Sequence, residues 1–248
     1  MKNILINADD FGFTENTDKG IIETVEFGSV TEVSMIMNSY SFNNALKFAK
    51  DNNWKFVGLH ITLFDVNKGD KPFRNADYER VLAEFDSKKL CMLIQHEISK
   101  FEDSFGFKPH HINAHKQLHF NPKVIDFIFD YASKNNIYVR KWGDFYTSTV
   151  IPSDLDFIKA KLKEYQIKTS DKLFGFEYDF ENPINVISKY KKLIDETPEN
   201  STIEILFHPG YCSDFEKTLT GFIKEREADR ILLCSGEFKA FLEQTINK

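Results

Sequence analysis

The sequence predicts an α/β protein built on a parallel sheet. Short apolar runs with the length of buried strands alternate along the chain with longer segments of helical periodicity. Several of these runs end abruptly in acidic residues, histidines or turn-forming glycines. Strand–helix alternation through one chain is typical of a parallel sheet. About seven such units are present, and that number favours an incomplete or deformed barrel.

The predicted strands share a short apolar core bounded by polar or turn-forming residues. In chain order they are Asn3–Asn7, Thr31–Met37, Phe56–Thr62, His110–His115, Ile137–Arg140, Lys172–Phe176 and Thr202–His208.

The predicted helices lie between these strands and show apolar residues at helical spacing. The first has an acidic first turn and ends before Gly28, and the fourth begins with Pro122 in its first turn. The last predicted segment is broken near Ser235 and Gly236. The helical segments are Glu15–Phe27, Ser41–Asn52, Ala76–Phe107 (at least one long helix), Pro122–Asn135 and Phe215–Ile246. The stretch Gly143–Lys172 is the least regular and is interpreted as a lid or rim.

Length and composition predict one domain that covers residues 1–248, since no linker interrupts the pattern. The net charge of -6, without a basic stripe, argues against binding to nucleic acid. No apolar run approaches the roughly 20 residues that span a bilayer. Met1 and Lys2 lead almost directly into the first strand, which leaves no room for a signal peptide. The three cysteines lack metal spacing, and reduced thiols fit a cytoplasmic protein.

Two adjacent carboxylates, Asp9 and Asp10, follow the first apolar strand. Buried acids are costly unless a positive group shares their site. The carboxyl ends of parallel strands are also where ligands and metals bind in α/β enzymes. The pair therefore indicates a functional site. The alternative is that these residues cap the helix that follows.

A polar face dominates the segment His110–Phe120. Read with the period of a strand, one face carries His111, Asn113, His115, Gln117 and His119. Such a face inside an apolar protein should look into a cavity that holds metal or substrate. The alternative is an edge strand with a solvated face.

Two further histidines lie at or near strand ends, His60 and His208. A single histidine in an apolar strand is usually a packed core residue. However, His115 and His119 would lie about 13 Å apart on an extended strand, too far to share one ion. A second imidazole beside His115 must then come from elsewhere, and His60 is the natural partner.

These motifs together resemble the YdjC-type carbohydrate deacetylases, the family of chitooligosaccharide deacetylases. The resemblance extends from Lys2 to about Gln244, and the matching segments are Asn7–Gly12, Gly58–Leu63, His111–His119 and His208–Tyr211. The chain departs from the family pattern at Asn113, Ala114, Lys116 and Gln117. These departures leave His115 in place and bear on sugar specificity more than on the reaction type.

The resemblance implies a TIM-like barrel and the metal-assisted hydrolysis of an N-acetyl group on an amino sugar or short chitin-type oligosaccharide. By this resemblance Asp10, His60 and His115 hold a divalent ion, Asp9 is the general base and His208 protonates the departing amine. The family suggests Mg²⁺, whereas the ligand set would also bind Zn²⁺ well. Gln117, His119 and Arg140 are further candidates for substrate contact.

Alternative functions stay open at this point. A close variant would act on a lipid-linked or nucleotide-linked amino sugar. Another metallohydrolase, such as a phosphoesterase, would normally need more His and Asp ligands. A non-catalytic sugar-binding protein is the third class, and the joint presence of Asp9, Asp10, His60, His115 and His208 argues against it. The oligomeric state is left open between a monomer and a homo-oligomer.

Overall fold

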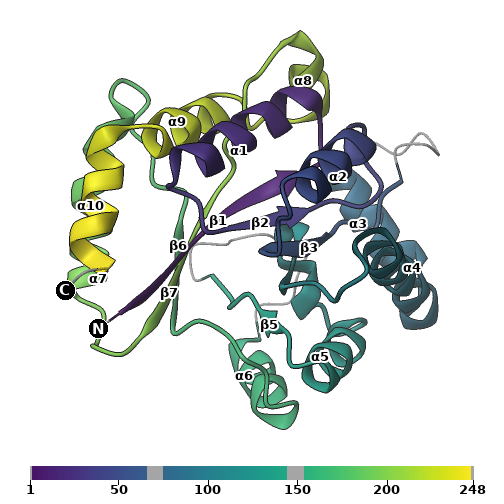
Figure 1. Ribbon diagram of the computed structural model, residues 1–248. Helices are drawn as coiled ribbons and strands as arrows, with labels where there is room; N and C mark the ends of the chain where they lie inside the picture. Colours follow the sequence, from purple (N-terminus) through teal and green to yellow (C-terminus); the bar gives the residue numbers. More distant parts are fainter. Residues whose placement is uncertain (1, 66–74, 144–153, 247–248) are drawn as a thin grey trace.

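The computed structural model describes residues 2–65, 75–143 and 154–246. Its centre is a curled sheet of seven parallel strands in the order β5-β4-β3-β2-β1-β7-β6, with helices packed around it (Figure 1). All seven predicted strands are confirmed, with small shifts at their ends. Their bounds are β1 (Asn3–Phe11), β2 (Glu32–Met35), β3 (Val57–Ile61), β4 (His111–Ala114), β5 (Tyr138–Val139), β6 (Lys172–Gly175) and β7 (Thr202–Phe207).

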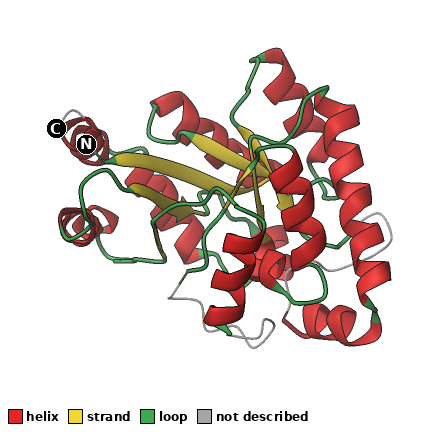
Figure 2. Ribbon diagram, turned by 90° about the horizontal axis from the view of Figure 1, so that it is seen from below, coloured by secondary structure: helices red, strands yellow, loops and turns green. Residues whose placement is uncertain are grey.

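Helices surround the sheet, as the view along a second direction also shows (Figure 2). The first is α1, whose predicted bounds of Glu15–Phe27 are confirmed. Thr14 caps it by accepting a hydrogen bond from the Thr17 N–H, and it ends at Gly28, which has a φ of 88°. The others are α2 (Phe42–Asp51), α3 (Asn75–Glu84), α4 (Ser87–Phe105), α5 (Ile125–Lys134), α6 (Leu155–Glu164), α7 (Ile187–Asp195), α8 (Asp214–Leu219), α9 (Lys224–Leu233), α10 (Gly236–Ile246) and the 3₁₀ helices η2 (His115–Phe120) and η3 (Pro183–Val186).

The structure differs from two expectations in detail: where α5 begins, and how irregular the stretch Gly143–Lys172 is. Pro122 does not begin α5, because Asn121 first forms a turn in which its side chain and carbonyl accept from the N–H groups of Lys123 and Val124. The stretch interpreted as a lid or rim contains the regular helix α6, capped by the Asp154 carboxylate. The remainder of that stretch, residues 144–153, lies outside the described residues.

The sheet separates an apolar layer from a polar interior. In β1 the alternate residues Ile4, Ile6 and Ala8 belong to the main hydrophobic core. Asn7 and Asp9, between and beyond them, form hydrogen bonds with polar side chains of neighbouring strands. Because successive strand residues point to opposite faces, this pattern places one polar row on the inside of the curl. Among the described residues, no helix combines the length and the apolar character needed to cross a membrane.

Candidate active site

The carboxylates of Asp9 and Asp10 both line one cavity, although they are neighbours in a strand. The register between β1 and β2 shifts by one residue between Ala8 and Phe11, and Asp10 has a φ of 71°. This bulge cancels the alternation that would send one of the two side chains to the opposite face. The alternative that the two acids cap α1 is wrong, because Thr14 occupies that position.

Asp10, His60 and His115 come together at this end of the sheet. One ligand atom from each lies within 4.8 Å of the others. His60 Nε2 is 3.4 Å from Asp10 Oδ1, and the two imidazole rings are 5.9 Å apart. His60 Nδ1 donates to Asn113 Oδ1 over 2.7 Å, so the Nε2 lone pair faces Asp10. Burial lowers the pKa of His115 well below its usual value, which keeps this imidazole neutral and able to bind a cation.

A buried arginine fixes Asp9. Arg140 donates from Nη1 and Nη2 to the two Asp9 oxygens over 2.6 and 2.9 Å, and from Nε to Glu204 over 2.6 Å. Burial alone would raise the pKa of Asp9, but the charge and hydrogen bonds of Arg140, together with the neighbouring His60 and His208, hold the pKa well below the usual range. Asp9 is therefore an ionised carboxylate with a fixed orientation. Arg140 itself is buried, so these ion pairs lie in the interior of the protein.

His208 lies on the other side of Asp9, with Nε2 3.7 Å from Asp9 Oδ2. Its ring packs between Phe176 and Phe222, and its backbone N–H donates to Asp229 over 2.8 Å. Burial lowers the pKa of His208 to about 4, an effect that the nearby carboxylates only partly offset. The imidazole is therefore neutral near pH 7.

A second arginine, Arg226 of α9, pairs with Asp10 Oδ2. Burial raises the pKa of Asp10, whereas the charge of Arg226 and the neighbouring imidazoles lower it. The net result is a pKa of about 2. Arg226 was missed in the sequence, because its helix contains many charged residues and nothing distinguishes the one that faces inward. Glu204 carried a usable signal, a single acid within an apolar strand.

The segment after β4 differs from its prediction. The strand ends at Ala114, and η2 follows with left-handed backbone at Lys116 and Gln117. The predicted 13 Å spacing of an extended strand therefore does not apply. Gln117 lines the cavity and accepts from the Gly143 N–H over 2.9 Å. His119 is not part of the lining and lies 3.2 Å from the Arg140 carbonyl.

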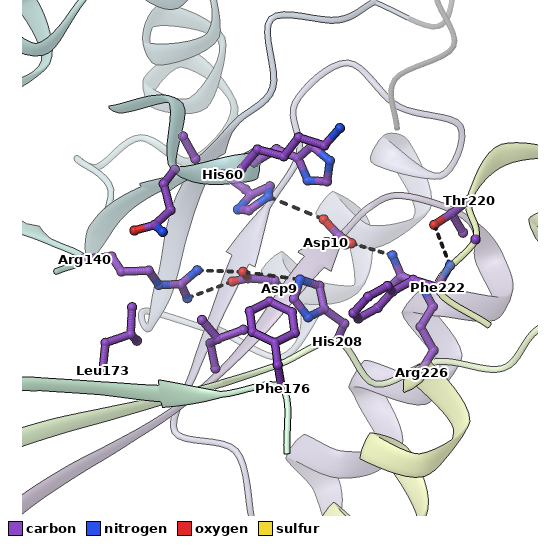
Figure 3. A pocket seen from close by; sticks show the side chains of 16 residues that line it. Asp9, Asp10, His60, Arg140, Leu173, Phe176, His208, Thr220, Phe222 and Arg226 are labelled. Carbon is purple, nitrogen blue, oxygen red and sulfur yellow. Dashed lines mark hydrogen bonds and ion pairs between the residues drawn. The ribbon is translucent and has the colours of Figure 1, made fainter. Parts of the chain in front are cut away.

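The cavity has a volume of about 310 Å³ and two unlike sides (Figure 3). Asp9, Asp10, His60 and His208 converge on its polar side. The apolar side is formed by Leu173, Phe176, Leu206 and Phe222.

The fold and this cavity define an α/β half-barrel protein with a carboxylate–histidine cluster at the carboxyl ends of its strands. The chain belongs to the family of YdjC-like proteins, whose model matches residues 3–244. The resemblance inferred from the motifs is thereby confirmed.

Relatives cover almost the whole chain. A carbohydrate deacetylase of Brevibacillus brevis is 22% identical, over 96% of this chain and 94% of its own length. A carbohydrate deacetylase of Thermoanaerobacter pseudethanolicus is 27% identical, over 98% and 94%. The crystal structure of a candidate cellobiose-phosphate cleavage protein from Enterococcus faecalis V583 matches with a TM-score of 0.76 and 23% identity, over 98% of this chain and 95% of that one, and this likeness supports the fold.

Proposed function

We propose that the protein is a metal-dependent hydrolase that removes the N-acetyl group from an amino sugar or a short chitin-type oligosaccharide. The observation that carries this proposal is the arrangement around Asp9. A possible three-residue ligand set lies on one side of this ionised carboxylate, and a neutral imidazole lies on the other. The relatives named carbohydrate deacetylases support a sugar substrate.

Asp10, His60 and His115 are the residues that would hold the ion. Their ligand atoms share one small volume, and His60 turns its Nε2 lone pair toward Asp10. Three protein ligands leave coordination positions for water and substrate. Because two of the three are imidazoles, the set suits Zn²⁺ better than a set of oxygen ligands alone would suit it. A divalent ion in this position would acidify a bound water and stabilise negative charge on the amide oxygen.

Asp9 is assigned the role of general base. Arg140 keeps it ionised, and the amides of Asn7 and Asn113 both donate to Oδ1, which leaves Oδ2 as the oxygen nearer to His208. A carboxylate of such low pKa is a weak base. It therefore accepts a proton only from an acidified water, and it passes that proton on readily.

His208 is assigned the role of general acid. It is neutral at rest, so it must receive a proton before it can donate one. Asp9 Oδ2, 3.7 Å from Nε2, is the group from which that proton comes. In balance, water adds to the amide carbon, one of its protons moves through Asp9 and His208 to the nitrogen, and the C–N bond breaks to give acetic acid and an amine. The acid then gives up its proton, which leaves acetate and an ammonium group.

The apolar side of the cavity fits the remainder of the substrate. Phe176 and Phe222 flank His208, close to where the leaving nitrogen would lie. Aromatic rings of this kind contact the acetyl methyl group or the apolar face of a sugar ring.

Acetate release from N-acetylglucosamine oligomers tests the proposal. We expect release by the wild type, loss after treatment with a chelator, and recovery with added Zn²⁺ or Mg²⁺, whichever is the working ion. Asp9→Asn should lower kcat by at least about a hundredfold, because it removes the base and keeps the shape. Asp103→Asn, the same change on the exposed face of α4, is the matched control.

Two outcomes would overturn the proposal. Activity unaffected by chelation and by Asp9→Asn would remove both the metal and the base. Phosphate release from simple phosphoesters, without acetate from free, lipid-linked or nucleotide-linked amino sugars, would assign a different reaction.

A further inference from the structure

A second carboxylate–histidine cluster lies at the opposite end of the strands. It consists of Glu32, the first residue of β2, together with His110 and His111, where β4 begins. One ligand atom from each of these residues lies within 4.8 Å of the others. None of the three lines the cavity described above.

Two distances within this cluster match those between ligands of a tetrahedral ion. His110 Nδ1 lies 3.2 Å from Glu32 Oε1, His111 Nδ1 lies 3.8 Å from Glu32 Oε2, and the two Nδ1 atoms are 3.4 Å apart. Zn²⁺ holds its ligands at about 2.0–2.1 Å, and tetrahedral geometry then separates them by about 3.3 Å. The distances from His110 Nδ1 to Glu32 Oε1 and to His111 Nδ1 lie close to that value, while His111 Nδ1 is nearer to the other carboxylate oxygen, Oε2, at 3.8 Å.

The fold provides space and orientation for His111. Strand register aligns Ser34 with Gly58, and a Cβ on Gly58 would come within 2.3 Å of His111 Nε2. Glycine at this position therefore leaves the room that the imidazole occupies. Nε2 lies 2.8 Å from Ser34 Oγ, which also accepts from the side-chain amides of Asn7 and Asn113. An ion bound at Nδ1 requires the tautomer in which the proton is on Nε2 and is directed at Ser34 Oγ.

Glu32 supplies an independent indication of a missing partner. Its side chain is almost fully buried, and within the described part of the chain Oε2 has no hydrogen-bond partner. This oxygen lies 3.8 Å from His111 Nδ1, so a cation between the two atoms would bind both. The neighbouring guanidinium of Arg140 is already shared by Asp9 and Glu204.

We propose that Glu32, His110 and His111 bind a divalent transition-metal ion of the Zn²⁺ type. The His110 side chain is 47% exposed, so the site opens to solvent and a water can complete the coordination. The ion joins the beginnings of β2 and β4 across β3, and its role is structural, because none of its three ligands lines the cavity that holds Asp9 and His208. This site does not depend on the proposed hydrolase activity.

Metal stoichiometry tests the proposal in an Asp10→Asn background, where the site beside the cavity is disabled. The full-length protein is stripped with a chelator, dialysed against Zn²⁺ and assayed by elemental analysis. We expect about one Zn²⁺ per chain in Asp10→Asn and none when His110→Gln or Glu32→Gln is added. His96→Gln, an exposed histidine of α4, is the control and should keep the ion.

A second measurement guards against misfolding. His110 is exposed, so its replacement should leave the far-UV circular dichroism unchanged. Zn²⁺ should raise the Tm of Asp10→Asn but not that of Asp10→Asn/His110→Gln. Equal zinc content and equal Tm shifts in these two variants would overturn the proposal, whether or not the enzyme deacetylates sugars.

Discussion

The two ends of the sheet carry nearly the same ligand set in different surroundings. Each has one carboxylate and two histidines within 4.8 Å of one another. At the carboxyl end, Asp10, His60 and His115 border a cavity that also contains Asp9 and His208. At the amino end, Glu32, His110 and His111 do not line that cavity. The two ends therefore differ less in the cluster itself than in its surroundings: a further carboxylate and imidazole, Asp9 and His208, lie beside the carboxyl-end cluster in the cavity.

The electrostatic surroundings also differ. At the carboxyl end each aspartate has its own arginine, Arg140 for Asp9 and Arg226 for Asp10. At the amino end burial opposes the ionisation of Glu32, and neighbouring imidazoles supply the effect that lowers its pKa. Permanent counter-charges thus hold the carboxyl-end acids ionised over a wide pH range.

The largest expected difference between the two clusters is in activity. Asp10→Asn should lower kcat/KM for acetate release by about a thousandfold, because it removes a ligand and leaves Arg226 unpaired in the cavity. Glu32→Gln should change kcat/KM by less than about threefold, since the amino-end cluster touches no reacting group. Steady-state acetate assays on both variants measure the contrast. Comparable losses in the two would show that the ends are not functionally distinct.

The largest expected effect on stability is the loss of Arg140, whose guanidinium pairs with both Asp9 and Glu204. Arg140→Gln leaves two buried carboxylates without their counter-charge and should lower the free energy of unfolding by about 3 kcal/mol. Urea denaturation measures this change. Arg80→Gln is the control: it removes an exposed ion pair with Glu84 and should cost less than about 0.5 kcal/mol.

A double variant checks the cause. In Arg140→Gln/Glu204→Gln one of the two uncompensated charges is also removed, so part of the loss should be recovered. If Glu204→Gln lowers the free energy of unfolding by the same amount in the Arg140→Gln background as in the wild type, packing rather than charge explains the effect.

Much of the fold and several residues of the candidate site were predictable from local patterns. The strands were found because each is a short apolar run, and Asp9, Asp10, His60 and His208 stood out because they lie at or near strand ends. These signals are local in sequence, and the shared edge of a parallel sheet turns them into one site.

Other features depend on tertiary context. Lys116 and Gln117 adopt left-handed backbone, although neither is a glycine or asparagine, the residues that usually indicate it. The alternating pattern therefore predicted an extended strand. The sequence likewise gives no indication of the bulge at Asp10, since that position is not a glycine. Arg226 is one of several charges in α9, and only packing shows which one is buried.

The smallest effect concerns Asp18, a buried acid near the carboxyl end that no arginine of the described residues is found to pair with. Its Oδ1 accepts from the Gly12 N–H over 2.6 Å and so holds the turn after Asp10. Burial raises the pKa of Asp18 to about 7, the opposite of the shifts at Asp9 and Asp10. The folded protein therefore binds a proton that the unfolded chain releases above about pH 4, and the associated stability is lost as the pH rises through 7.

Asp18→Asn removes this titration and keeps an oxygen for Gly12. From pH 5 to pH 8 the free energy of unfolding of the wild type should fall by about 2 kcal/mol relative to Asp18→Asn. Urea denaturation at each pH measures the difference, with Asp103→Asn as an exposed control whose curve should run parallel to that of the wild type. A difference that stays constant with pH would mean that Asp18 is ionised in the fold. Arginine pairing would then not be what sets Asp9 and Asp10 apart from other buried acids at this end of the sheet.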